Sequence, residues 1–238
     1  MFKRLIATGA LFTLALTPVA GSAQDAAAPQ EEVSQSEAPA APAAPKVYDA
    51  INYNVDEDRE NILVLDLSNG KRLQIRLMEQ WAPNHIARIK TLARQGFYDG
   101  IIFHRVIEGF MAQTGDPTGT GQGGSELPDL KAEFNPMPHL RGTVSMARAQ
   151  SDDSANSQFF IVFTPKFALD KKYTNLGRVI SGMDAVDAIT RGEPPANPTR
   201  ILQASIAADN KPVPPSPAIA APKPMTITAD MLSKPVGE

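Results

Sequence analysis

Apolar and polar residues alternate over several short stretches of the chain, a pattern typical of strands that are buried on one face. Residues 62–67 carry a leucine at every second position, and residues 72–77 repeat the alternation. Between them, Asn69-Gly70 predicts a tight hairpin turn, because both residues tolerate a positive φ. The same criteria predict further strands at 101–106, 143–147, 158–164, 176–179 and 201–207.

Two stretches have helical spacing instead. Pro83 suits the first position of a helix, apolar residues then recur every three or four positions, and Gly96 ends the pattern. Residues 183–190 predict a second helix. Short strands with two separate helices favour a mostly antiparallel β-barrel or sandwich.

The first 23 residues have the pattern of an export signal. Lys3 and Arg4 precede an apolar run that ends in the small residues Gly-Ser-Ala at 21–23. This order predicts a signal peptide over 1–23 that is cleaved after Ala23. An uncleaved membrane anchor is the alternative, but the run is short for a membrane span. We therefore expect a periplasmic protein without stable membrane insertion after cleavage.

Two segments rich in proline flank the central region. Residues 24–46 form an Ala/Pro-rich linker, and residues 210–238 form a Pro-rich C-terminal tail. Both lack the apolar side chains that would offset the entropy of ordering, so we expect disordered termini. Residues 47–209 then form one domain. Removal of both flanking segments should leave turnover of short peptides nearly unchanged.

Composition excludes several classes of function. The chain has 238 residues, of which 42% are hydrophobic, and its net charge of −3 argues against nonspecific nucleic-acid binding. It has no cysteine, so disulfides and thiolate chemistry are excluded. Its three histidines lack the spacing of zinc ligands, and we expect no metal.

One continuous motif decides the function. Residues 103–116, Phe-His-Arg-Val-Ile-Glu-Gly-Phe-Met-Ala-Gln-Thr-Gly-Asp, closely resemble the signature of the cyclophilins, which are peptidyl-prolyl cis/trans isomerases (rotamases). Ordered blocks at 145–148, 156–161, 169–173 and 177–179 extend the resemblance over roughly residues 60–207.

The resemblance implies both a fold and a site. The fold is mainly β: a closed eight-stranded antiparallel β-barrel that two α-helices cap, with the substrate groove on its outer surface. The catalytic residues that it implies are Arg105, Gln113 and Phe110. The substrate-binding residues are Met111, Gly121, Ala147, Arg148, Gln158, Phe160, Phe167, Leu169 and Tyr173. No cofactor is implied, and the expected partners are proline-containing unfolded or flexible polypeptides, bound by a monomer.

These residue types suit the reaction. Rotation about a peptide bond breaks amide resonance at a cost of about 18–20 kcal/mol. A catalyst needs only to bind the twisted amide better than the planar forms. The guanidinium of Arg105 would stabilise the pyramidal prolyl nitrogen, while Gln113 and the main chain of Arg148 would hold the substrate backbone.

Some positions depart from the best-known members of the family. Arg148 stands where an asparagine is common, and Tyr173 stands where a histidine is common. The rim tryptophan of those members is absent, since the only tryptophan is Trp81, and Phe167-Ala168 precede Leu169 instead. This absence predicts weak cyclosporin binding.

Simpler interpretations compete at single residues. The Gly-rich run 119–124 formally matches a dinucleotide-binding motif, but it lacks the flanking strand and helix. His104 is expected to have a structural hydrogen-bonding role, and Phe159 is expected in the core with Phe160 in the groove. Two alternative functions remain open: a non-catalytic module that binds proline-containing segments, and a chaperone.

Overall fold

The computed structural model describes residues 46–215, so the predicted signal peptide and most of the linker and tail lie outside the described residues. The described part forms one compact unit. Its strands are β1 (Ile62–Leu67), β2 (Arg72–Leu77), β3 (Arg105–Ile107), β4 (Met111–Thr114), β5 (Thr143–Met146), β6 (Phe159–Val162), β7 (Asn175–Ser181) and β8 (Ile201–Ile206). Its helices are α1 (Pro83–Arg94) and α2 (Met183–Asp187), with 3-10 turns η1 (Arg59–Asn61), η2 (Phe167–Leu169) and η3 (Ala207–Asp209).

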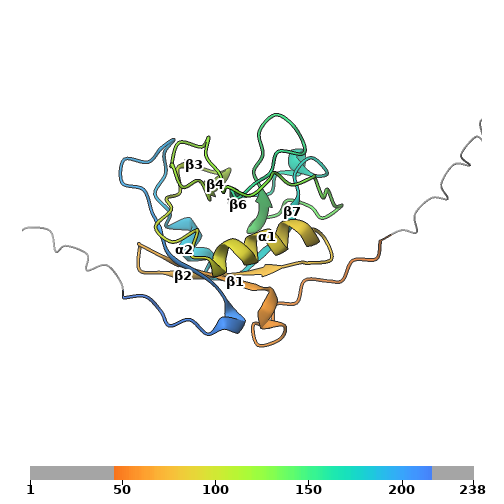
Figure 1. Cartoon of the computed structure of the whole chain (residues 1–238), viewed down its shortest axis with the longest axis horizontal. Helices are drawn as coiled ribbons and strands as arrows, with labels where there is room; N and C mark the ends of the chain where they lie inside the picture. The colour runs from red at the N-terminus through yellow and green to blue at the C-terminus, as the bar shows by residue number, and fades with distance from the viewer. Residues whose placement is uncertain (1–45, 216–238) are drawn as a thin grey trace, which may run out of the picture. The chain divides into compact units, whose positions relative to one another are not determined.

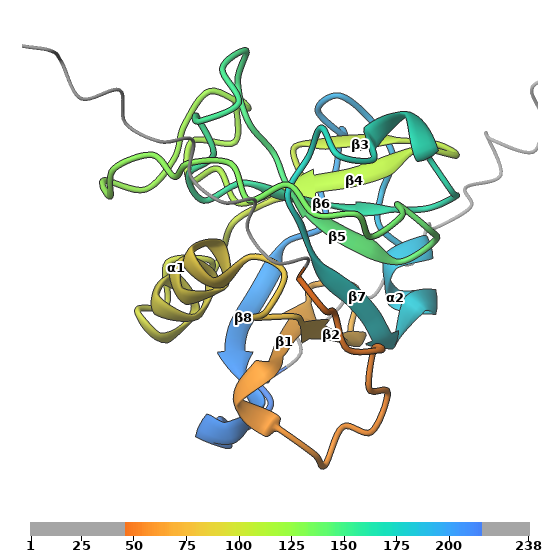
Figure 2. The same ribbon diagram turned by 90° about the vertical axis from the view of Figure 1, so that its right-hand side faces the viewer.

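The eight strands form one curled antiparallel sheet in the order β3-β4-β6-β5-β7-β2-β1-β8. In Figure 2, β7 links the group β3, β4, β6 and β5 to the group β2, β1 and β8. In the view of Figure 1, α1 crosses in front of the sheet, and Figure 2 shows that it lies beside β8. The mainly β class, the eight strands and the two helices are confirmed.

The two ends of the strand order, β3 and β8, are not joined by a ladder. Backbone hydrogen bonds instead link residues 101–103, which precede β3, to residues 199–201 at the start of β8: Phe103 N donates to Thr199 O at 2.9 Å, and Ile201 N donates to Ile101 O at 2.9 Å. Closure of the barrel therefore stays a prediction.

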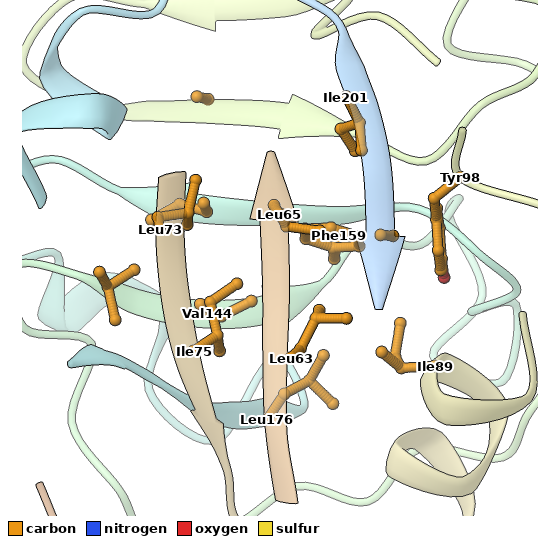
Figure 3. Close-up of a cluster of buried hydrophobic side chains, with 14 of the residues drawn as sticks. Leu63, Leu65, Leu73, Ile75, Ile89, Tyr98, Val144, Phe159, Leu176 and Ile201 are labelled. Carbon is orange, nitrogen blue, oxygen red and sulfur yellow. The ribbon is translucent and has the colours of Figure 1, made fainter. Parts of the chain in front are cut away.

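The hydrophobic core lies inside the curl of the sheet. Leu63 and Leu65 of β1 stand opposite Ile75 and Leu73 of β2, and all four are at most 1% exposed. Figure 3 shows these side chains converging with Ile89 of α1 and with the strands on the far side of the sheet. The alternate apolar residues of β1 and β2 thus form the inner face of the sheet, as the sequence pattern predicts.

The hairpin between β1 and β2 has a different turn from the one predicted. Gly70 has a φ of +78°, but Asn69 does not have a positive φ. Gly70 N donates to Leu67 O, and Leu67 N donates to Lys71 O. This is a type I turn followed by a left-handed glycine, which allows one residue more than the two-residue turn. The side chain of Asn69 instead accepts from Lys71 N.

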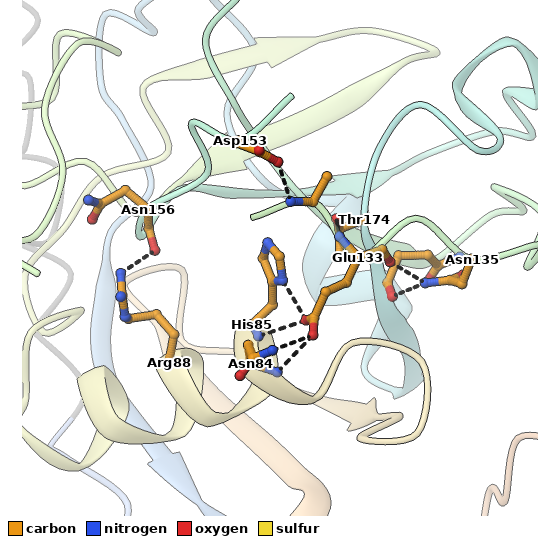
Figure 4. A network of polar contacts seen from close by, with 10 residues as sticks. Asn84, His85, Arg88, Glu133, Asn135, Asp153, Asn156 and Thr174 are labelled. Carbon is orange, nitrogen blue, oxygen red and sulfur yellow. Dashed lines mark hydrogen bonds and ion pairs between the residues drawn. The ribbon is translucent and has the colours of Figure 1, made fainter. Parts of the chain in front are cut away.

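A distant carboxylate caps the first helix. Ala82 precedes α1 and offers no side-chain cap. Glu133 fills that role: its carboxylate accepts from the backbone N–H groups of Asn84 and His85 at 3.2 and 3.1 Å, and from His85 Nδ1 at 2.7 Å (Figure 4). A negative charge at a helix N-terminus is favourable, so Glu133 fixes the start of α1.

Three elements differ most from the sequence prediction. The ladder of β3 begins only at Arg105, because Ile102 makes an isolated bridge to Arg200. Strand β4 has no counterpart in the predicted pattern. Helix α2 ends at Asp187, although Ile189 beyond it is buried in the core and continues the apolar spacing.

Candidate active site

A second apolar cluster lies on the outer face of the sheet. Alternate residues of β3, β4, β6 and β5 point into the core, namely Val106, Ala112, Ile161 and Val144. The intervening positions on β4 and β6 form a separate cluster of Met111, Phe160 and Val162. Partly buried side chains that pack against it are Ile107, Phe110, Ala147, Leu169 and Tyr173.

Neighbouring phenylalanines therefore belong to opposite faces of β6. Phe159 is fully buried in the core and meets Tyr98 edge to face, with ring centroids 5.6 Å apart. Phe160 lies in the outer cluster, where its ring meets Tyr173 edge to face at 5.6 Å. This placement follows directly from the two-residue period of a strand.

A polar row runs beside the apolar cluster. Arg105 on β3 stands opposite Gln113 on β4, and Gln113 stands opposite Phe160 on β6. Gln113 Nε2 donates to Gln158 Oε1 at 2.8 Å. A guanidinium, an amide and an aromatic ring are thus held side by side by strand register.

Arg105 is half-exposed and is held by one contact. Its side chain is 43% exposed, and its Nε donates to Glu193 Oε2 at 2.8 Å. Within residues 46–215, the two Nη atoms have no hydrogen-bond partner. The sequence reasoning did not find Glu193, because it lies 88 positions away in a Pro-rich segment.

A glycine-rich loop forms a hollow next to this row. The hollow has a volume of about 440 Å³, and its lining includes Gln113, Gly121, Ala147, Arg148 and Gln158. Gln158 Nε2 donates to the carbonyls of Gly121 and Gly123 at 3.1 and 2.7 Å. The loop backbone is therefore tied to the same glutamine that binds Gln113.

Asp116 organises that loop from within. Its buried carboxylate accepts from Thr118 N at 2.7 Å, from Gly121 N at 2.6 Å and from Gly123 N at 3.1 Å. Burial acts to raise the pKa of Asp116, but the hydrogen bonds together outweigh it and lower the pKa from 3.8 to about 2. The loop thus encloses a fixed negative charge.

The side chain of Arg148 lies against Tyr173 at the edge of the outer cluster. Its guanidinium lies 4.9 Å from the centroid of the Tyr173 ring and pairs with Asp152 at 3.0 Å. Within the described range, the backbone N–H and C=O of Arg148 have no hydrogen-bond partner. The main chain is thus available for the role that the resemblance implies.

Phe167 is the one predicted site residue that the structure leaves apart. It is 62% exposed in η2, whereas Leu169 at the end of the same turn packs against the outer cluster. The remaining predicted residues lie in the cluster, the polar row or the hollow. Their roles in catalysis and binding stay predictions.

The histidines do not form a reactive centre. His139 is buried between Asp170 and Ser145, with Nδ1 2.8 Å from Asp170 Oδ1 and Nε2 2.9 Å from Ser145 Oγ, and Ser145 is itself 0% exposed. Burial lowers the pKa of His139 and of His104. The hydrogen-bonding role expected of His104 is wrong, since both ring nitrogens are buried and find no partner among the described residues.

Residues 46–215 contain no cluster of three or more metal-binding side chains. The same range has no helix of the length and apolarity that a membrane span requires.

Comparison with known sequences decides the family. The sequence model of the cyclophilin-type peptidyl-prolyl cis-trans isomerases matches residues 62–206. The chain belongs to the cyclophilin family. A probable peptidyl-prolyl cis-trans isomerase of Brucella suis is 48% identical over 170 residues, which cover 65% of this chain and 86% of the relative. Peptidyl-prolyl cis-trans isomerase B of Bacillus subtilis is 41% identical over 128 residues, which cover 53% of this chain and 89% of the relative.

Solved cyclophilins have the same fold. Cyclophilin AquaCyp293 of Hirschia baltica aligns with a TM-score of 0.60 and 30% identity over 65% of this chain and 77% of its own. A Cryptosporidium parvum cyclophilin, whose crystal structure was determined in the presence of the dipeptide Ala-Pro, aligns with a TM-score of 0.57 and 28% identity. That alignment covers 61% of this cyclophilin and 98% of the parasite chain.

Proposed function

We propose that this cyclophilin catalyses the cis/trans isomerisation of X-Pro bonds on the outer face of its sheet, without a covalent intermediate. The observation that carries the proposal is the register Arg105–Gln113–Phe160, which sets a guanidinium beside an apolar cluster. The proline ring would bind on Met111 and Phe160, since aromatic and thioether side chains offer large, adaptable contact area.

Arg105 would act on the twisted amide. As the amide rotates, the prolyl nitrogen becomes pyramidal and gains a lone pair, which a guanidinium donor stabilises in the twisted form alone. The unpartnered Nη atoms of Arg105 are suited to that bond, because guanidinium stays charged. A hydrogen bond to a charged group contributes about 1.5–3 kcal/mol, and each ~1.4 kcal/mol is tenfold in rate.

Two groups would hold the peptide while one side of the amide rotates. Gln113 would bond the substrate backbone on one side, and the free main chain of Arg148 would do so on the other. Holding the reactant in place saves rotational entropy at the transition state. No proton transfer is needed, so the buried histidines have no part in this scheme.

Exchange spectroscopy on a short Ala-Pro peptide tests the proposal. The wild type should accelerate cis/trans exchange, and Arg105→Ala should slow it at least tenfold. Arg94→Ala is the matched control, because Arg94 on α1 is similarly exposed at 41% and also ion-paired, but lies away from the cluster. A folded wild type without exchange activity would leave the non-catalytic proline-binding module as the better account.

The cellular setting is also part of the proposal. The export signal over 1–23 supports a periplasmic enzyme that assists the folding of exported, proline-containing proteins. Weak cyclosporin binding and a monomeric state remain part of this account. Fractionation of the native host, with N-terminal sequencing of the product, tests it: recovery of an uncleaved chain in the cytoplasm would refute it.

We also infer that the barrel is closed. The bonds between residues 101–103 and 199–201 support this, because they bridge the two ends of the strand order. Protection of the Phe103 and Ile201 amides from hydrogen exchange is expected, and rapid exchange at both would contradict closure.

A further inference from the structure

A segment far along the chain returns to the outer edge of β3. Gly192 N donates to Val106 O at 2.9 Å, and Val106 N donates to Gly192 O at 2.8 Å. β3 is the end strand of the sheet order (Figure 2), so this bridge covers its free edge.

Two ion pairs of opposite polarity flank that bridge. On one side, Arg105 Nε lies 2.8 Å from Glu193 Oε2. On the other, Arg191 Nε lies 2.8 Å from Glu108 Oε2. Antiparallel pairing of Val106 with Gly192 sets Arg105 opposite Glu193, so the backbone places the Glu193 carboxylate next to the Arg105 guanidinium.

The segment that carries Glu193 is anchored independently of its ion pair. Arg191 donates from Nη1 to Asp187 O at 2.7 Å, and its guanidinium lies 4.3 Å from the centroid of the Phe163 ring. Pro195, two residues after Glu193, is buried. These contacts fix the backbone that carries Glu193, whose own side chain is 51% exposed.

From this geometry we propose that Glu193 is a positioning residue for Arg105. The contact uses Nε–H alone, which leaves the four Nη hydrogens for the substrate. A free arginine side chain loses rotamer entropy when it is ordered, and this loss is a cost in free energy. Glu193 removes part of that cost before the substrate binds. This inference rests on the proposed function of Arg105.

Matched variants on the same edge test the proposal. Glu193→Ala should lower kcat about three- to tenfold with KM nearly unchanged, because orientation of Arg105 acts in the transition state. Glu193→Gln keeps a hydrogen-bond acceptor on a side chain of the same length, so its kcat should fall less than that of Glu193→Ala. Glu108→Ala removes the mirror-image ion pair, which does not contact Arg105, and should change kcat less than twofold.

A spectroscopic readout separates positioning from general stability. In NMR, the Arg105 Nε–H proton should be protected from exchange with solvent in the wild type and in Glu108→Ala. This protection should be lost in Glu193→Ala. This signal tests the contact whether or not the protein turns over peptides. A wild type without exchange activity would therefore refute the proposed function alone.

Several results would overturn the positioning role. One is an equal loss of kcat in Glu193→Ala and Glu108→Ala. Another is a rise in activity in Glu193→Ala, which would make Glu193 a competitor for the guanidinium. An Arg105 Nε–H signal that is unprotected in the wild type would also overturn it.

Discussion

At the scale of single residues, Asp116 links the stability of the domain to the shape of its groove. It is 1% exposed, and its carboxylate receives the backbone N–H groups of the glycine-rich loop. Removing the charge would leave those donors with a weaker acceptor, while the side chain stays buried. The loop wall beside Gln158 therefore depends on an ionised carboxylate.

Asp116→Asn should destabilise the protein in a pH-dependent way. Because the pKa of Asp116 falls from 3.8 to about 2 on folding, its charge contributes about 2 kcal/mol of stability above about pH 4. That contribution is lost as the pH falls towards 2. Urea unfolding at several pH values should show the deficit of the variant at pH 7 and its disappearance near pH 2.

Asp129→Asn is the control, since Asp129 lines the same hollow but is exposed. At pH 7 it should lose less stability than Asp116→Asn, because its carboxylate is exposed to solvent. A deficit of Asp116→Asn that is equally large at pH 7 and pH 2 would contradict the electrostatic explanation.

Residues that act through a contiguous motif could be predicted from the sequence, and those that act through tertiary contacts could not. Arg105, Gln113 and Phe160 lie in two short blocks, and strand period sets their faces. Glu193 and Glu133 reach their partners only through the fold. The missing partners of His104 likewise depend on which groups surround it after packing.

At the scale of elements, two glycines beside β4 differ in what surrounds them. Gly109 and Gly115 both have a positive φ, of +65° and +91°. A Cβ on Gly109 would meet nothing within 4 Å, whereas one on Gly115 would lie 2.5 Å from Ser157 O and 2.8 Å from Gln158 Cα. Only Gly115 is required for the close approach of two backbones.

Gly115→Ala should therefore impair both folding and turnover. Gly109→Ala should cost about 1–2 kcal/mol of stability, which is the penalty of a left-handed non-glycine residue. Gly115→Ala should cost about 1–3 kcal/mol more, because the backbone at Ser157 and Gln158 must move. Displacement of Gln158 should also lower peptide exchange several-fold. Thermal unfolding and exchange rates measure both effects, and equal losses in the two variants would contradict the account.

Elements with regular periods could be predicted, whereas short ones with mixed composition could not. The hairpin of β1 and β2 is visible because every second residue faces the core. Strand β4, Met-Ala-Gln-Thr, has little strand propensity, and its pairing with β3 and β6 comes from the tertiary structure. The predicted second helix is longer than α2 because Ile189, which is buried in the core, lies in a turn after the helix and not in the helix itself.

At the scale of the whole domain, the proposed function assigns stability and chemistry to opposite faces of the sheet. Its inner face carries the large core around Leu65 and Phe159, while its outer face carries the small cluster around Met111 and Phe160. Because the interior is filled with side chains, a peptide can bind only on the outside. The resemblance to cyclophilins implied this division, and strand register accounts for it physically.

Methyl NMR with an Ala-Pro peptide tests that central claim most directly. Met111 lies in the outer cluster and Met146 lies in the core, so the two methionine methyls report on opposite faces. The account predicts that the peptide shifts and exchange-broadens the Met111 signal and leaves the Met146 signal in place. In Arg105→Ala the shift should remain, while the broadening from turnover should largely disappear. An unchanged Met111 signal, or equal changes at Met146, would contradict catalysis on the outer face.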